Sequence, residues 1–379
     1  MFGVLGFPLY FLRNRGRALA LFLIIVLAVM EVSTVALLTG SLLGDLRLTM
    51  VAPFQYFTEI VASDALVPAS ISAGVAARPQ TELLLPMIPE VIRVNTLIGP
   101  GTRNVFSVPT TFMPWFLRHI GERLVAGRLP AASADEIALP RQVMQNRRLH
   151  IGDTVGQQVD PNEWLPGQFR IVGVLGGALD AGITSYEAMR SFTALQAVPG
   201  VASYAAFARP GQRSAMDAYM ATLPLDQVRV YTKGAEQQEY RQDVRMLNWL
   251  LWSINLVTVG VLAVAMGLLN NLYYMQRMDE YGILAAMGLT HGLLLRRALV
   301  EVAAITSASW GAGLGLTVAL TGALGRWLFS PHGIALPRLD VHDIAFTLPI
   351  PVLISLFTLA TVLRRLSRLD PVSVVERRD

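Results

Sequence analysis

The sequence predicts a helical membrane protein with four spans, arranged as one span, a large α+β domain and then three spans. Hydrophobic residues make up 53% of the 379 residues and charged residues only 15%, which is too apolar for an ordinary soluble protein. Four apolar runs are long enough to cross about 30 Å of hydrocarbon at about 1.5 Å per residue. Residues 44–243 contain no such run and are punctuated by proline and glycine, as in a globular domain.

The first span is predicted at residues 18–43. The preceding residues 1–17 include Arg13, Arg15 and Arg17 and no acid, so this end is expected in the cytoplasm. A signal peptide also begins with basic residues and an apolar run. This run is longer than a signal h-region, however, and no small-residue cleavage site follows it. We therefore interpret it as an uncleaved span.

Glu31 lies near the middle of the first span. An ionisable side chain at the bilayer centre costs roughly 3 kcal/mol on insertion scales, so Glu31 is expected to face protein or water rather than lipid. Two interpretations stay open. Glu31 lines a dimer interface or a substrate path, or it is protonated or paired with a neighbouring helix and has a packing role.

Residues 44–243 are interpreted as an extracytoplasmic α+β domain. Short runs rich in β-branched residues predict strands, and longer runs that begin at proline or contain helix-forming residues predict helices. Strands are predicted at 91–94, 105–108, 137–139 and 169–175, and helices at 140–149, 186–197 and 214–222. Between residues 46 and 124 the pattern is weakest, and residues 46–58 are expected to continue the first helix outward.

The other three spans are predicted at residues 247–269, 298–320 and 344–363. In the third span, Gly311 and Gly315 have the spacing that allows two helices to approach closely. In the fourth span, Pro349 and Pro351 are expected to kink or unwind the outer part of the helix.

The arginine clusters predict the orientation of the chain. Residues 1–17, the loop 270–297 and the tail 364–379 carry these clusters and are predicted in the cytoplasm. Residues 44–243 and the short loop 321–343 are therefore predicted outside. Both termini are then cytoplasmic.

The loop 270–297 contains a short amphipathic segment. Arg277 and Glu280 come first, apolar residues such as Leu284 follow at roughly helical spacing, and Gly288 stands where a helix would end. A segment of this kind is too short and too polar to span a membrane. It must lie on the membrane surface or dock on another protein.

This segment resembles the loop between the second and third spans of ABC-transporter permeases of the FtsX/MacB type, also called type VII or mechanotransmission systems. In that family an R-x-x-E-x-G-I-L-x-A-x-G pattern forms the coupling helix that rests on the cytoplasmic ATPase. The matching residues here are Arg277, Glu280, Gly282, Ile283, Leu284, Ala286 and Gly288. The alternative is a generic surface helix that joins two spans.

Two further regions carry the same resemblance. In the large domain, Gly127–Arg128, Ile151-Gly152-Asp153 and the run 169–174 occur in the order seen in MacB-like extracytoplasmic domains. The tail ends DPVSVVERRD, which is similar to the usual terminus of the family. The resemblance therefore implies a domain of MacB-like type.

The resemblance also implies partners and a function. It implies a homodimer in the cytoplasmic membrane of a bacterium, in contact with membrane lipid, with two ATPase subunits and an extracytoplasmic adaptor as a further partner. ATP and Mg would be bound by the ATPase. ATP hydrolysis would then drive export or extraction of a substrate at the outer face of the membrane. The alternative function is a signal relay that activates an extracytoplasmic partner, such as a cell-wall hydrolase, without transport.

The residues of the chain argue against catalysis on the chain itself. Lys233 is the only lysine and lies between Thr232 and Gly234, which is not the Gly-Lys-Ser/Thr order of a P-loop. Any ATP site must therefore belong to another subunit. No G-x-S-x-G motif and no acid–base pair is evident, so a membrane-bound enzyme is disfavoured and no catalytic residue or cofactor is predicted.

Metal and nucleic-acid binding are also disfavoured. The chain has no cysteine, and His332 and His342 share a loop with Asp340 and Asp343 without a metal-ligand spacing. A solvated loop is the favoured interpretation there. The net charge is +4, but the arginine clusters flank apolar runs, which indicates membrane orientation rather than binding of nucleic acid.

Overall fold

The structure is a computed structural model and describes residues 15–64, 66–96, 99–193, 200–275, 287, 290–329 and 341–366. These residues fall into two compact units. The helical unit comprises Met1–Gly40, Leu247–Leu324 and Leu336–Asp379, and the sheet unit comprises Ser41–Met246 and Gly325–Ala335.

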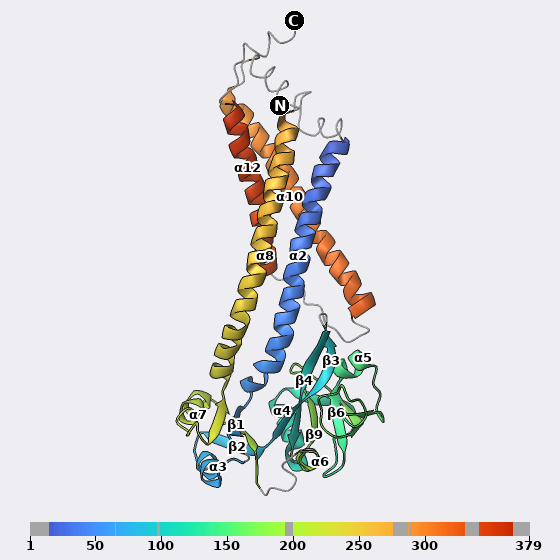
Figure 1. The fold of residues 1–379 in the computed structure, drawn as a ribbon, viewed down its shortest axis with the longest axis vertical. Helices are drawn as coiled ribbons and strands as arrows, with labels where there is room; N and C mark the ends of the chain where they lie inside the picture. The colour runs from blue at the N-terminus through green and yellow to red at the C-terminus, as the bar shows by residue number, and fades with distance from the viewer. Residues whose placement is uncertain are drawn as a thin grey trace. The chain divides into compact units, whose positions relative to one another are not determined.

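Long helices build the helical unit (Figure 1). They are α10 (His291–Leu324), the short α11 (Val341–Thr347), α12 (Pro349–Leu366), and most of α2 (Arg15–Met50) and α8 (Lys233–Met275), whose residues 41–50 and 233–246 belong to the sheet unit. A π-helical turn at Gly325–Phe329 follows α10 and is also assigned to the sheet unit. Among the described residues, three stretches are long and apolar enough to cross a membrane: Phe22–Met50, Lys233–Val261 and Leu299–Trp327. They overlap the first three predicted spans. The fourth span and the 1+3 arrangement stay predictions.

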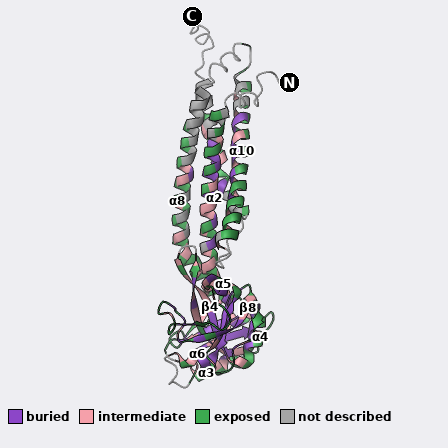
Figure 2. Cartoon of the chain, turned by 90° about the vertical axis from the view of Figure 1, so that its right-hand side faces the viewer, coloured by how far each residue is buried: buried purple, intermediate pink, exposed green. Residues whose placement is uncertain are grey.

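A small apolar core joins the helices of this unit. Ile25 and Val29 of α2 pack with Val259 of α8, with Ile354 of α12, and with the partly buried Trp310 of α10. The Nε1 of Trp310 donates a hydrogen bond of 2.9 Å to the hydroxyl of Thr347. Outside this core, the residues of α8 and α10 whose burial is described are largely exposed or half-buried (Figure 2).

The predicted interruption at the prolines is confirmed. α11 ends at Thr347 and α12 begins at Pro349. Pro349 has no backbone N–H to donate to the preceding turn, and a proline disfavours helical geometry at the residue before it. The helix therefore stops and restarts at Leu348.

The sheet unit contains a four-stranded antiparallel sheet in the order β11-β1-β10-β2. Its strands are β1 (Thr58–Ala62), β2 (Thr81–Pro86), β10 (Ser203–Ala208) and β11 (Val228–Tyr231). Helices α3 (Ala69–Ala76) and α7 (Arg213–Met220) bury Ile71, Val75, Met216 and Met220 against Ile60 and Val228 of the sheet. This sheet brings together strands from both ends of the unit.

The second sheet is mixed and has seven strands, in the order β3-β4-β9-β6-β8-β5, with β7 paired to β8. The strands are β3 (Ile88–Thr96), β4 (Gly99–Val108), β5 (Glu122–Gly127), β6 (Glu136–Pro140), β7 (Thr154–Val155), β8 (Phe169–Gly177) and β9 (Gly182–Ser185). The pairs β4–β9 and β6–β8 are parallel. In Figure 2 the strands at the centre of the sheet unit are coloured largely as buried.

Alternating side chains give this sheet two apolar faces, because successive residues of a strand point to opposite sides. Phe106 and Ala138 belong to a core with α4 (Met113–His119), whereas Val105 and Ile137 belong to a core with α5 (Arg141–Arg147) and α6 (Tyr186–Ser191). The first core also contains Phe57, Leu85 and Phe207, so it connects the two sheets.

Most of the predicted elements of this unit are confirmed. The four predicted strands lie within β3, β4, β6 and β8, and the predicted helices 140–149 and 214–222 coincide with α5 and α7. The predicted helix 186–197 begins with α6, which ends at Ser191, and residues 194–197 lie outside the described part of the chain. The predicted continuation of the first helix over residues 46–58 is confirmed only as far as Met50 and is wrong beyond it. α2 ends at Met50, a 3-10 turn follows at Pro53–Gln55, and β1 begins at Thr58. The chain turns there because Phe57 enters the core beneath the sheets.

Candidate functional site

The predicted coupling residues lie outside the described part of the chain. They are Arg277, Glu280, Gly282, Ile283, Leu284 and Gly288. The segment follows α8, which ends at Met275, and precedes α10, which begins at His291. Met287 is described and is 60% exposed. The role of this segment therefore stays a prediction.

Glu31 is exposed on α2. Within the described residues its carboxylate has no hydrogen bond or ion pair, whereas the neighbouring Thr34 hydroxyl donates back to the carbonyl of Met30 at 2.7 Å. This face of α2 is open to lipid, water or a second chain. Both interpretations of Glu31 stay predictions.

The glycines of α10 differ from one another. Gly311 and Gly315 are exposed, and a Cβ added at either would meet no atom within 4 Å. Gly313 is buried, and a Cβ there would lie 2.8 Å from Cβ of Val29 and 2.9 Å from the carbonyl oxygen of Val26. Within the chain, the close approach of α10 to α2 therefore occurs at Gly313. Close packing at Gly311 and Gly315 stays a prediction.

A buried ion cluster in the sheet unit was not predicted. Arg103 of β4 contacts Asp45 at 2.7 Å and Asp180 at 3.1 Å, and the side chains of Arg103 and Asp180 are only 12% and 11% exposed. Burial raises the pKa of Asp180, and the Arg103 guanidinium opposes this rise. The three residues are far apart in sequence, so no local motif reveals them.

Glu122 lies beside this cluster and is buried. One of its carboxylate oxygens accepts hydrogen bonds from the backbone N–H of Leu179, at 3.0 Å, and from that of Asp180, at 2.8 Å. Its other oxygen is buried and has no partner among the described residues. Burial raises the pKa of Glu122 to about 7, although the N–H donors oppose the shift. A Cβ at Gly177 would lie 2.4 Å from the Glu122 carboxyl carbon, so only glycine fits opposite this side chain.

A second buried carboxylate lies in the four-stranded sheet. Glu59 of β1 is 6% exposed and accepts a hydrogen bond of 3.0 Å from the hydroxyl of Ser203. Burial raises its pKa to about 7, and the nearby Glu236 adds to the rise. The sheet unit thus contains two separate buried carboxyl groups, Glu59 and Glu122, whose pKa is raised to about 7.

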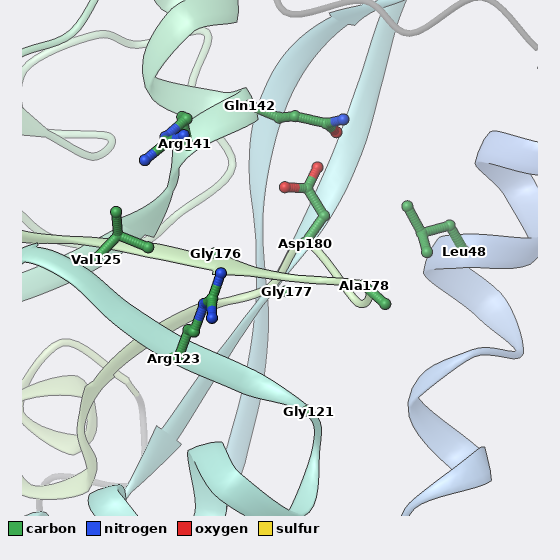
Figure 3. Close-up of a pocket in the computed structure, with 10 residues that line it drawn as sticks. All are labelled: Leu48, Gly121, Arg123, Val125, Arg141, Gln142, Gly176, Gly177, Ala178 and Asp180. Carbon is green, nitrogen blue, oxygen red and sulfur yellow. The ribbon is translucent and has the colours of Figure 1, made fainter.

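A cavity of about 620 Å³ opens beside the ion cluster (Figure 3). Its walls come from α2, β5 and the residue before it, α5, the end of β8 and the segment after β8. The lining residues are Leu48, Gly121, Arg123, Val125, Arg141, Gln142, Gly176, Gly177, Ala178 and Asp180. In Figure 3 the two arginines and Val125 gather toward one end, and Gln142, Asp180 and Leu48 toward the other.

The long apolar helices together with the α/β unit indicate a membrane protein that carries a globular domain. Residues 252–371 match the model of the FtsX-like permease C-terminal family. The matched stretch contains the end of α8, the loop, α10 and α12, and the resemblance predicted from the sequence is confirmed. The family supports a permease subunit of an ABC-type system.

Two solved structures match about half of the chain, at low identity and with low TM-scores. The periplasmic region of MacB from Actinobacillus actinomycetemcomitans is 12% identical with a TM-score of 0.31, over 49% of this chain and 92% of that one. The extracellular domain of the noncanonic ABC-type transporter YknZ from Gram-positive bacteria is 8% identical with a TM-score of 0.30, over 46% of this chain and 100% of that one. No curated protein matches the chain.

Proposed function

We propose that the chain is the permease subunit that couples ATP hydrolysis by a separate ATPase to export or extraction of a substrate at the outer face of the cytoplasmic membrane. The observation that carries the proposal is the family match, because residues 252–371 include the loop with the coupling pattern. The chain contributes no P-loop lysine, so the ATP and Mg sites belong to the partner.

The exposed surface of α8 supports a dimer. Leu250, Ile254, Val257 and Val261 are each more than half exposed, and their spacing of four, three and four residues places them along one face of the helix. An exposed apolar helix face of this kind must be covered by lipid or by other helices. We propose that a second copy covers part of this surface and that two ATPase subunits bind the dimer.

The coupling segment can be tested through Leu284. If the segment docks in a groove of the ATPase, Leu284 is a buried anchor, and burying a leucine stabilises by roughly 1.5–3 kcal/mol. Leu284→Asp is therefore expected to weaken ATPase binding at least about tenfold, since about 1.4 kcal/mol is a factor of ten. The measurement is co-purification of the ATPase, with the mass of the complex in detergent reporting two copies of each chain.

A matched control is Leu225→Asp, which adds the same charge at a 73% exposed residue of the sheet unit. It is expected to leave co-purification unchanged. If Leu284→Asp inserts, dimerises and retains the ATPase with full coupled activity, residues 276–288 are a linker and the coupling assignment fails.

The proposed orientation places the sheet unit outside and both termini in the cytoplasm. The chain has no cysteine, so single cysteines can be introduced cleanly. Ser133 is exposed in the loop between β5 and β6, and Ser133→Cys is expected to react with an impermeant thiol reagent added to intact cells. Ser373→Cys, in the tail, is expected to react only after permeabilisation. The reverse labelling pattern would reject this topology.

A further inference from the structure

One end of the cavity in the sheet unit carries positive charge. Arg123 of β5 and Arg141, the first residue of α5, are exposed and lie toward this end (Figure 3). Neither guanidinium forms a hydrogen bond or an ion pair with another described residue. In the same unit Arg103 and Arg147, by contrast, each pair with a carboxylate that is largely buried. The cavity therefore offers two guanidiniums to a ligand.

The other end of the cavity carries negative charge, from Asp180 (Figure 3). Arg103 contacts Asp180 at 3.1 Å and Asp45 at 2.7 Å, so one cation serves two carboxylates and the cluster keeps one negative charge. The Nε of Arg103 donates to Oδ2 of Asp180, whereas Oδ1 has no partner among the described residues and is not fully buried. Oδ1 is therefore free to accept a hydrogen bond from a ligand.

The lining between the two ends is neutral. Gln142 forms no hydrogen bond with another described residue, and its side-chain amide offers both donors and an acceptor. Leu48 and Val125 add apolar surface, and Gly176 leaves the floor without a side chain. A Cβ at Gly176 would lie 2.9 Å from Cγ2 of Val125, so glycine keeps this floor open. Such a lining suits a ligand with amide groups and small apolar side chains.

The size of the cavity and the placement of its charges limit the ligand further. The cavity has a volume of about 620 Å³, within the roughly 300–1,000 Å³ of pockets that enclose molecules larger than a single amino acid. In a free amino acid the ammonium and carboxylate groups share one carbon atom. In an extended tripeptide they lie about 10 Å apart, at roughly 3.3–3.6 Å per residue. Opposite charges at the two ends of a cavity of this volume therefore favour a short peptide.

We propose that this cavity binds a short peptide with free termini, its carboxylate at Arg123 and Arg141 and its ammonium group at Asp180. Arginine is suited to the carboxylate because its planar fork donates two parallel hydrogen bonds to the two oxygens. Gln142 contacts an amide of the peptide between them. A simple anion or a simple cation matches only one end of the cavity, whereas the peptide matches both. This inference concerns the sheet unit alone and does not rest on coupling to an ATPase.

The test measures peptide binding to the full chain, purified in a neutral detergent without the ATPase, by isothermal titration calorimetry. The probes are the tripeptide Ala-Leu-Ala, its carboxy-terminal amide and its N-acetyl derivative. The wild-type chain is expected to bind the free tripeptide at least tenfold more tightly than either derivative, because each derivative lacks one of the two terminal charges. The N-acetyl derivative tests the contact with Asp180 without a substitution there, since Asp180 also pairs with Arg103 in the fold.

The arginine end is tested by Arg123→Gln with Arg141→Gln. This variant is expected to bind the free tripeptide at least tenfold more weakly than the wild type and to bind the free acid and the amide equally. Its unfolding temperature is expected to be unchanged, because both arginines are exposed and unpaired among the described residues. The matched control is Arg209→Gln with Arg229→Gln, which removes the same charge at exposed arginines that do not line the cavity. It is expected to bind the tripeptide as the wild type does.

Three results would overturn the proposal. The first is the absence of binding of Ala-Leu-Ala to the wild-type chain at millimolar concentration. The second is equal binding of the tripeptide by the cavity variant and the control. The third is binding of the N-acetyl derivative as tight as that of the free tripeptide, which would show an anion site only. Co-purification of the ATPase is expected to be unchanged in every variant, so failure of this proposal is distinguishable from failure of the proposed function.

Discussion

Arg103→Met is expected to destabilise the sheet unit by roughly 3–5 kcal/mol, the range seen when one partner of a buried ion pair is removed. Arg103 lies between Asp45 and Asp180, and the Asp180 side chain is only 11% exposed. Methionine fills a similar volume but leaves the Asp180 charge buried without a cation. The loss is measured by urea unfolding of the full chain in detergent, followed by protease sensitivity of the sheet unit.

The loss of stability caused by Arg103→Met is expected to increase as the pH rises. Burial already raises the pKa of Asp180, and the opposing effect of Arg103 disappears in the variant. A carboxyl whose pKa is raised in the folded state destabilises that state as pH rises through the raised pKa. The variant is therefore expected to be closer to the wild type at pH 5 than at pH 8.

Arg128→Met is the control for this change. Arg128 pairs with Glu136 at the surface, where its side chain is 57% exposed, and an exposed ion pair contributes little to stability. Its effect is expected to be much smaller than that of Arg103→Met. Equal effects of the two changes, or a loss independent of pH, would contradict the buried-charge argument.

Gly313→Leu is expected to be the most damaging glycine substitution in α10. Even a Cβ would lie 2.9 Å from the carbonyl oxygen of Val26, and backbone of α2 cannot rotate away as a side chain can. Forcing extra atoms into a packed contact costs roughly 1–3 kcal/mol. The helical unit is expected to unfold at lower temperature, and the ATPase activity of the complex to fall as α2 and α10 separate.

Gly311→Leu and Gly315→Leu provide matched controls on the same helix. Both positions face open space within the chain, and leucine is a better helix former than glycine by several tenths of a kcal/mol or more. These variants are expected to keep or raise the unfolding temperature of the chain. A loss of dimer in the controls without loss of stability would place the glycine pair against a second copy. Equal destabilisation by all three changes would contradict the close approach at Gly313.

The helices and strands that can be predicted well are those whose pattern lies in residues next to one another in the sequence. The alternating run at residues 169–174 and the proline-led helix at Arg141–Arg147 can be recognised from neighbouring residues alone. The four-stranded sheet was not predicted because β1 and β11 pair across most of the sheet unit, and nothing in either short strand specifies a partner so distant in sequence. The strands β2 and β10 were missed for the same reason.

Whether a candidate site can be predicted also depends on how close its residues lie in the sequence. The coupling pattern is contiguous and therefore visible in the sequence, although it lies outside the described residues. Arg103, Asp45 and Asp180 are separated by 58 and 77 residues, and ordinary charged residues at such distances carry no signal. From the sequence alone, Glu122 would be interpreted as a surface acid, because it lies in a short polar run. Only the fold shows that Gly177 makes room for it and that backbone N–H groups bind it.

The connection between the two sheets determines the order in which they can form during synthesis of the chain. All seven strands of the mixed sheet lie between Ile88 and Ser185, as one insertion between β2 and β10. The backbone N–H of Met87 donates to the carbonyl of Ser203 at 3.0 Å, so the insertion leaves and rejoins the four-stranded sheet at a single point. During synthesis the mixed sheet has all its strands before residue 203 emerges from the ribosome, whereas β1 must wait for β10 and β11. The insertion therefore completes its strand pairing first, but one of its two cores is complete only when Phe57, Leu85 and Phe207 of the four-stranded part have joined it.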